Sequence, residues 1–364
     1  MSGVGRGAVP PETPDDAAMT TTASATTFDR KKTIIGLIVT VVILAVVFLG
    51  VIPKIGSYSE AWESIKTIPG AWLAALVGIV VGMVIVYVWP YQAAIPHLKY
   101  GPAFVVRQTS FTISNAVPAG GAVGLAMQYA MLASYEVPGA TATAGIAITS
   151  VWSVFMTLGL PIMGVLALLI TGQLEQKFLL AGVVGVAAIV GAVIVFWLIL
   201  RSEPSARRVG SWGDRIARPV TKRIKRPIDV TAAILHFREG IVDVVSARWR
   251  WITVSNIIVV LVQYLVLYVA IRSVGGQRSE GFNIVAGFAA FAISRLASMI
   301  PVTPGGLGTV DAALIGLLVT FGLDKDDALA ADLVWRAASF VPQVLLGVVT
   351  FIIWRARQQR RGGL

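Results

Sequence analysis

The chain has 364 residues, of which 56% are hydrophobic and 13% are charged, and its mean hydropathy is +0.79. Soluble globular proteins carry about 25% charged residues, so these apolar stretches do not fit inside one water-soluble core. The lack of cysteine excludes disulfides and thiolate metal sites, and the two histidines are far apart. We therefore expect an integral membrane protein without a metal or another cofactor. The net charge of +11 is attributed to membrane topology, and no nucleic-acid partner is expected.

The first part of the chain predicts a disordered cytoplasmic tail. Residues 1–29 are rich in Pro, Thr, Ala and Asp and hold scarcely any large apolar residue. The apolar stretch that follows is long enough to span a bilayer, which favours a signal anchor over a cleaved signal peptide. A span of about 30 Å of hydrocarbon needs about 20 apolar residues. Such runs predict spanning helices at residues 33–52, 71–93, 140–170, 178–200, 251–274 and 328–354.

Two further apolar segments, residues 103–132 and 283–321, are each interrupted near the middle by a proline and paired glycines. Each predicts a helix, a break and a second helix, and we expect both to be re-entrant hairpins. With six crossing helices, most of the 30 lysines and arginines then lie on the side of the termini. The positive-inside rule therefore predicts a multi-pass protein of the cell (inner) membrane with both termini in the cytoplasm.

The two broken segments resemble each other. Pro118-Ala-Gly-Gly-Ala-Val-Gly124 is similar to Pro304-Gly-Gly-Leu-Gly308, and Val-Trp pairs ending at Trp152 and Trp335 follow at nearly equal distances. The surroundings of the two hairpins are inverted in the expected topology, and inverted repeats with broken helices are typical of transporters. The alternative is that proline and glycine merely kink or pack membrane helices.

The expected fold is therefore all-α, with two membrane halves arranged as an inverted repeat. Residues 30–200 form the first half and residues 251–355 the second. Residues 201–250 form a basic cytoplasmic linker, and residues 356–364 a basic tail. From Asp229 onward the linker is predicted to be an amphipathic helix on the membrane surface, where its basic residues would attract anionic headgroups. The alternative is that the linker only connects the two halves. Its apolar face consists of Ile234, Phe237, Ile241, Val244 and Val245.

The motifs also carry a family resemblance. Residues 294–311 together with residues 333–336 resemble the C-terminal signature of the lysylphosphatidylglycerol synthase transmembrane region, also called the flippase-like domain family, and residues 115–124 resemble its N-terminal counterpart. The resemblance covers about residues 32–357, and Asp311 stands where the family usually has Glu. It implies a membrane region that flips a lipid made by an adjoining aminoacyl-transferase domain. We expect this chain to act without such a domain and a separate lipid-modifying enzyme to be a partner.

Two arginines fall within apolar segments and are the first candidates for substrate binding. Arginine at the bilayer centre costs about 2.5–3.5 kcal/mol, so Arg295 and Arg336 are expected to face the bundle interior. A guanidinium fits a lipid phosphate with two parallel hydrogen bonds. Asp311 is expected to hold an arginine or to carry a proton, and a structural Arg–Asp lock without a ligand is the alternative. Further candidates for the substrate site are Thr303, Asn115 and the glycines at the two breaks, Gly120, Gly121, Gly305 and Gly306. Gln128 and Gln343 are weaker candidates. For Asn115, Gln128 and Gln343, a hydrogen bond between helices is the more typical role.

Taken together, these patterns predict a flippase that moves an anionic lipid or a lipid-linked precursor between leaflets. A small-solute secondary transporter of the same architecture remains an alternative. A third candidate function is that of a polyprenyl-phosphate-dependent glycosyltransferase that uses outward-facing acids. The candidates for these acids are Glu60, Glu63 and the acidic cluster at residues 324–327. Carboxylates just before a span commonly cap its N-terminus, and no phosphate-binding loop or Ser-His-Asp pattern is present, so we do not expect an enzyme.

Overall fold

The computed structural model describes residues 57–116, 120–170, 172, 176–224, 229–276, 281–299 and 306–362. Within these residues every regular element is a helix, which confirms the predicted all-α class. The predicted tail at residues 1–29 and the first predicted span at residues 33–52 lie outside the described residues.

Among the described residues, four segments are long and apolar enough to cross a membrane. They contain the predicted spans at 71–93, 140–170, 251–274 and 328–354. A fifth helix, α8 (Gln176–Arg201), contains the predicted span at 178–200, and residues 190–201 within it form a shorter apolar helix. The four segments are α3 with α4 (Gly70–Val86 and Trp89–Ala94), α7 (Gly139–Ile170), α10 (Val230–Gly275) and α13 (Lys325–Gly362).

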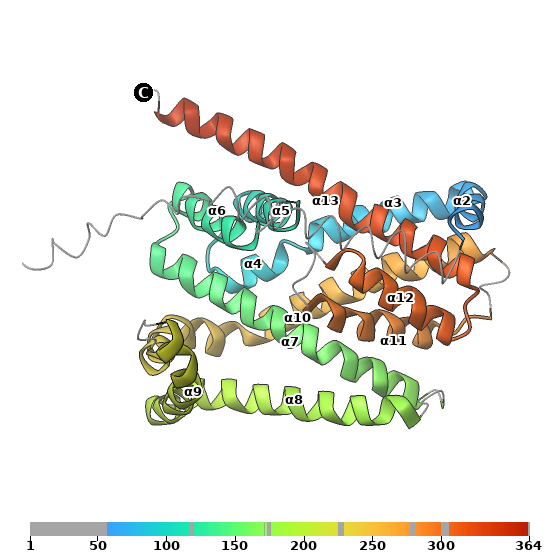
Figure 1. Ribbon diagram of the computed structural model, residues 1–364. Coiled ribbons are helices and arrows are strands. Elements are labelled where there is room, and N and C mark those ends of the chain that lie inside the picture. The colour runs from blue at the N-terminus through green and yellow to red at the C-terminus, as the bar shows by residue number, and fades with distance from the viewer. Residues whose placement is uncertain are drawn as a thin grey trace, which may run out of the picture.

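Both broken segments have the predicted order of helix, break and helix. The first consists of α5 (Tyr100–Ala116) and α6 (Gly120–Ser134), which pack against each other. The second consists of α11 (Ile284–Ser294), the 3-10 helix η4 (Arg295–Met299) and α12 (Thr309–Thr320). Figure 1 shows α5 and α6 toward the end of the bundle where α9 (Glu203–Ile224) lies, and α11 and α12 toward the end where α2 (Tyr58–Lys66) lies. Re-entrance into the membrane stays a prediction.

Helix α10 runs without interruption through the predicted boundary between residues 250 and 251. Its start is capped by two acids, since Asp229 accepts a hydrogen bond from the Ala232 amide at 2.7 Å and Asp214 of α9 accepts one from the Val230 amide at 2.7 Å. The predicted apolar face of the linker is buried at Ile241 and Val245, but it packs on protein: its partners are alanines and other apolar residues of α4 and α7. Protein contact thus replaces the expected membrane-surface contact there.

The tryptophans of the repeated Val-Trp pairs lie on α7 and α13 and pack these two helices against the rest of the bundle. Trp152 of α7 is buried and donates its indole N–H to the Thr253 hydroxyl of α10 at 3.0 Å. Trp335 of α13 is buried in the core that α13 forms with α2, α3, α10, α11 and α12. At the start of α13, the Ser57 amide donates to the Asp326 carboxylate at 2.6 Å, which fixes α2 against this helix.

The close packing of α5 on α13 provides a test of the fold. A Cβ atom added at Gly347 would lie 2.5 Å from the backbone oxygen of Gln108, and it would also clash with the Thr112 side chain. Overpacking of this kind costs about 1–3 kcal/mol, so we expect Gly347→Ala to lower the thermal unfolding midpoint in detergent. Gly78→Ala is the matched control because no atom lies within 4 Å of its added Cβ. Equal stability of the two variants would contradict the α5–α13 contact.

Candidate functional site

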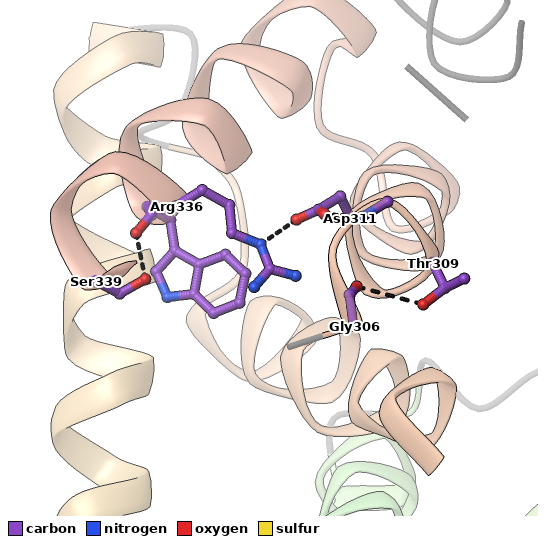
Figure 2. A network of polar contacts seen from close by, with 7 residues as sticks. Gly306, Thr309, Asp311, Arg336 and Ser339 are labelled. Carbon is purple, nitrogen blue, oxygen red and sulfur yellow. Dashed lines mark hydrogen bonds and ion pairs between the residues drawn. The ribbon is translucent and has the colours of Figure 1, made fainter. Parts of the chain in front are cut away.

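Asp311 joins the two helices α12 and α13 of the second half. Its side chain is 0% exposed. One carboxylate oxygen, Oδ2, accepts a hydrogen bond from the Gly308 amide at 2.5 Å, and the other, Oδ1, pairs with Nε of Arg336. Figure 2 shows this ion pair between the two helices. The predicted Arg–Asp pair is therefore present. The amide at the start of α12 is also satisfied within the protein, because the carboxylate occupies the place that an external anion would take.

The second predicted arginine meets the first at a shared aromatic ring. Arg295 lies at the start of η4, and its guanidinium donates to Gln263 Oε1 of α10. Its guanidinium carbon lies 5.9 Å from the ring centre of Trp335, and the guanidinium carbon of Arg336 lies 4.9 Å from the same ring centre. In addition, Nη2 of Arg336 is buried without a hydrogen-bond partner among the described residues. The structure thus gathers both predicted arginines around Trp335 and leaves one buried donor unpaired.

A third arginine, Arg107, belongs to the same region and was missed by the sequence analysis. It extends from α5, and Nη1 donates to Gln343 Oε1 at 2.5 Å and to Gln108 Oε1 at 2.7 Å. Its guanidinium also lies 4.1 Å from the ring centre of Tyr87. The topology expected from the sequence counts Arg107 among the cytoplasmic charges. Its position inside the first apolar hairpin, as Arg295 is inside the second, was the signal that would have identified it.

Arg107 and Arg295 line two neighbouring cavities. The larger has a volume of about 590 Å³ and is lined by Arg107; the smaller has a volume of about 280 Å³ and is lined by Arg295. Gln263 lines both of them, and the rest of the wall is rich in hydroxyl and amide groups. No aspartate or glutamate lines either cavity in the part of the chain that the structure describes. The cavities share four lining residues, namely Ser153, Asn256, Val259 and Gln263.

The other predicted site residues are distributed unevenly. Gly121, at the start of α6, and Gln128 line the larger cavity. Gly120 packs so closely on the Ile113 carbonyl that a side chain would not fit. The Asn115 side-chain amide donates a hydrogen bond to the Phe111 carbonyl of its own helix at 2.8 Å.

In the second hairpin, Gly306 has a backbone φ of 67°, which favours glycine, and it packs against Ser298. Gly305 and Thr303 lie outside the described residues. Whether any of the predicted residues binds a substrate stays a prediction.

The outward-facing acids lie apart from the arginines. Glu60, Glu63, Asp324 and Asp326 line a separate cavity of about 490 Å³ between α2 and the start of α13. Asp324 accepts a hydrogen bond from the Asp326 amide at 2.9 Å, so the predicted capping role is confirmed for this residue.

The family follows from the sequence match. Residues 33–347 match the family model described as the lysylphosphatidylglycerol synthase TM region. The chain belongs to this family. Among curated relatives, a UPF0104 membrane protein of Methanothermobacter thermautotrophicus is 33% identical over 64 residues, which cover 18% of this chain and 18% of the relative. A UPF0104 membrane protein of Methanocaldococcus jannaschii is 40% identical over 60 residues, which cover 16% of this chain and 26% of the relative. The similarity to these relatives therefore spans a minor part of each protein, whereas the family match spans both membrane halves.

Proposed function

We propose that the protein is a flippase that moves an anionic lipid, or an anionic lipid-linked precursor, between the two leaflets of the cell membrane. Its membership of the lysylphosphatidylglycerol synthase TM region family and its long apolar helices support a transporter-like role in the membrane. The single observation that carries the proposal is the pair of neighbouring cavities with an arginine in each and no carboxylate in their described walls.

The charge balance of these cavities favours an anion. In the described part of the chain, Arg107 and Arg295 hydrogen-bond to the side-chain oxygens of glutamines and to no carboxylate. A cation in an apolar bundle is costly unless an opposite charge compensates it. A phosphate group would supply that charge, and a guanidinium binds phosphate with two parallel hydrogen bonds. The remaining hydroxyl and amide groups of the walls would replace the water around a lipid headgroup.

We further propose that the two broken helix pairs act as opposed gates on either side of this region, with both termini in the cytoplasm. The positions of α5–α6 and α11–α12 toward opposite ends of the bundle support this arrangement. Alternating access requires two gates of opposite orientation, and inverted repeats supply them. A separate enzyme would then modify the lipid before or after it crosses.

The experiment is leaflet exchange in proteoliposomes that contain fluorescent lipids with different headgroups. Quenching by external dithionite measures the fraction of label exposed on the outer leaflet over time. We expect protein-dependent exchange of lipids with a net negative headgroup and slower exchange of a zwitterionic lipid with the same acyl chains. Equal exchange of all lipids would indicate nonspecific scrambling. No exchange of any phospholipid or polyprenyl-phosphate lipid by folded protein would contradict the proposal and favour a small solute.

A further inference from the structure

A second acid lies beside the Asp311–Arg336 ion pair and has no part in the proposed lipid binding. Asp332 is on α13, one helical turn before Arg336, and its side chain is 1% exposed. Asp311 and Arg336 are its charged neighbours. One of its carboxylate oxygens, Oδ1, is buried without a hydrogen-bond partner among the described residues.

The geometry identifies which of the two acids carries a proton. Two ionised carboxylates buried close together repel each other, and one arginine balances the charge of only one of them, so one of the two acids is neutral. Both oxygens of Asp311 accept hydrogen bonds, one from the Gly308 amide and one from Arg336, as an ionised carboxylate does. Asp332 is therefore the neutral partner. A single guanidinium balances a single carboxylate, whereas a second charged carboxylate would remain uncompensated in this buried place.

The groups that act on Asp332 come from three helices: Asp311 of α12, Arg336 of α13 and Tyr58 of α2. Burial raises the pKa of the Tyr58 phenol, as does the negative charge of Asp311, so this phenol stays protonated at neutral pH. Tyr58 follows Ser57, whose amide is bonded to Asp326. Asp326 lines the acidic cavity with Glu60 and Glu63, and Ser59, the residue after Tyr58, lines this cavity as well.

We propose that Asp332 is a proton-binding site that couples proton movement to the handling of the anionic substrate. The Asp332 carboxyl releases its proton to water of the acidic cavity, and the resulting carboxylate accepts a hydrogen bond from the unpaired Nη2 of Arg336. The two residues are four apart on one helix face and so are neighbours. When the proton returns, this hydrogen bond is lost and Nη2 is again available to an anion. Proton binding by Asp332 and anion binding by Arg336 therefore favour each other.

This inference rests on the proposed function for its consequence, but the proton site itself is measured without transport. Infrared difference spectra of the reconstituted protein, recorded between low and high pH, report the C=O stretch of protonated carboxylic acids. We expect a titrating buried carboxyl band in the wild type and in Asp243→Asn, whose parent residue is exposed on α10. The band should be absent from Asp332→Asn, which mimics the neutral acid and preserves its shape. A full band in Asp332→Asn would overturn the proposal.

Coupling is measured by the final distribution of labelled lipid in vesicles with a pH difference across the membrane. One proton per lipid predicts about a tenfold enrichment in one leaflet for each pH unit, since the proton ratio itself changes tenfold. Asp332→Asn is expected to give an even distribution at any pH difference. If no lipid moves but the Asp332 band titrates, the flippase proposal fails and the proton site stands. If lipid moves without a titrating band or a pH effect, the flippase stands and the coupling proposal fails.

Discussion

Replacing Arg295 with glutamine is expected to slow headgroup-dependent lipid exchange by about tenfold to a hundredfold while the protein stays folded. Hydrogen bonds to charged groups contribute about 1.5–3 kcal/mol, which corresponds to this range. The fold should persist because the partners of Arg295 are neutral: the Gln263 amide and the rings of Phe291 and Trp335. Its removal thus leaves no unpaired buried charge. The measurement is dithionite quenching, with unfolding in detergent recorded for the same preparation.

Arg107→Gln is expected to behave in the same way, because Arg107 also has glutamine partners and lines the other cavity. The matched control is Arg250→Gln, which removes an exposed arginine from α10 and should leave exchange unchanged. If both cavity variants exchange lipid at the rate of the control, the cavities do not carry the substrate. A loss in Arg295→Gln alone would restrict the phosphate to the smaller cavity.

Replacing Arg336 with methionine is expected to destabilise the protein by about 3–5 kcal/mol, because it leaves a buried carboxylate without its cation. The partner, Asp311, is fully buried and the Arg336 side chain is 16% exposed. Asp311→Asn should cost less, since the asparagine oxygen still accepts from the Gly308 amide and Asp332 can ionise and pair with Arg336 in its place. Thermal unfolding in detergent checks the expected order of stability, in which wild type is followed by Asp311→Asn and then by Arg336→Met. Equal stability of Arg336→Met and wild type would contradict this order.

The double variant Arg336→Met with Asp311→Asn separates a substrate role from a structural lock. Removing both charges often restores the stability that a single removal destroys. Restored stability together with restored lipid exchange would indicate a lock that binds nothing. Restored stability without exchange would indicate that Arg336 acts on the substrate. Because Arg336 is part of this ion pair, Arg107 and Arg295 are the cleaner positions at which to test transport in folded protein.

The membrane character, the all-helical class and the order of helix, break and helix were determined by the sequence itself. Apolar runs long enough to cross a bilayer leave the backbone no other way to satisfy its hydrogen bonds, and proline with paired glycines interrupts a helix wherever it occurs. That Asp311 pairs with an arginine was also expected from sequence, since an arginine in an apolar segment requires a partner, but the structure identified that arginine as Arg336. The apolar face at Ile241 and Val245 was readable from its spacing, whereas its partner, protein instead of lipid, was not.

Tertiary structure decided which charges share one place. The position of Arg107 inside an apolar hairpin indicates a buried arginine, but its partner Gln343 lies far along the chain and is not evident from the sequence. The packing of α5 on α13 brings Arg107 to Gln343, and the contact of η4 with α10 brings Arg295 to Gln263. The proposed role of Asp332 also depends on tertiary structure, because the packing of α12 on α13 places Asp311 near it. The sequence shows that a charge in an apolar segment costs free energy unless a partner compensates it. It does not show which side chain is that partner, because the partner lies on another helix that only folding brings close.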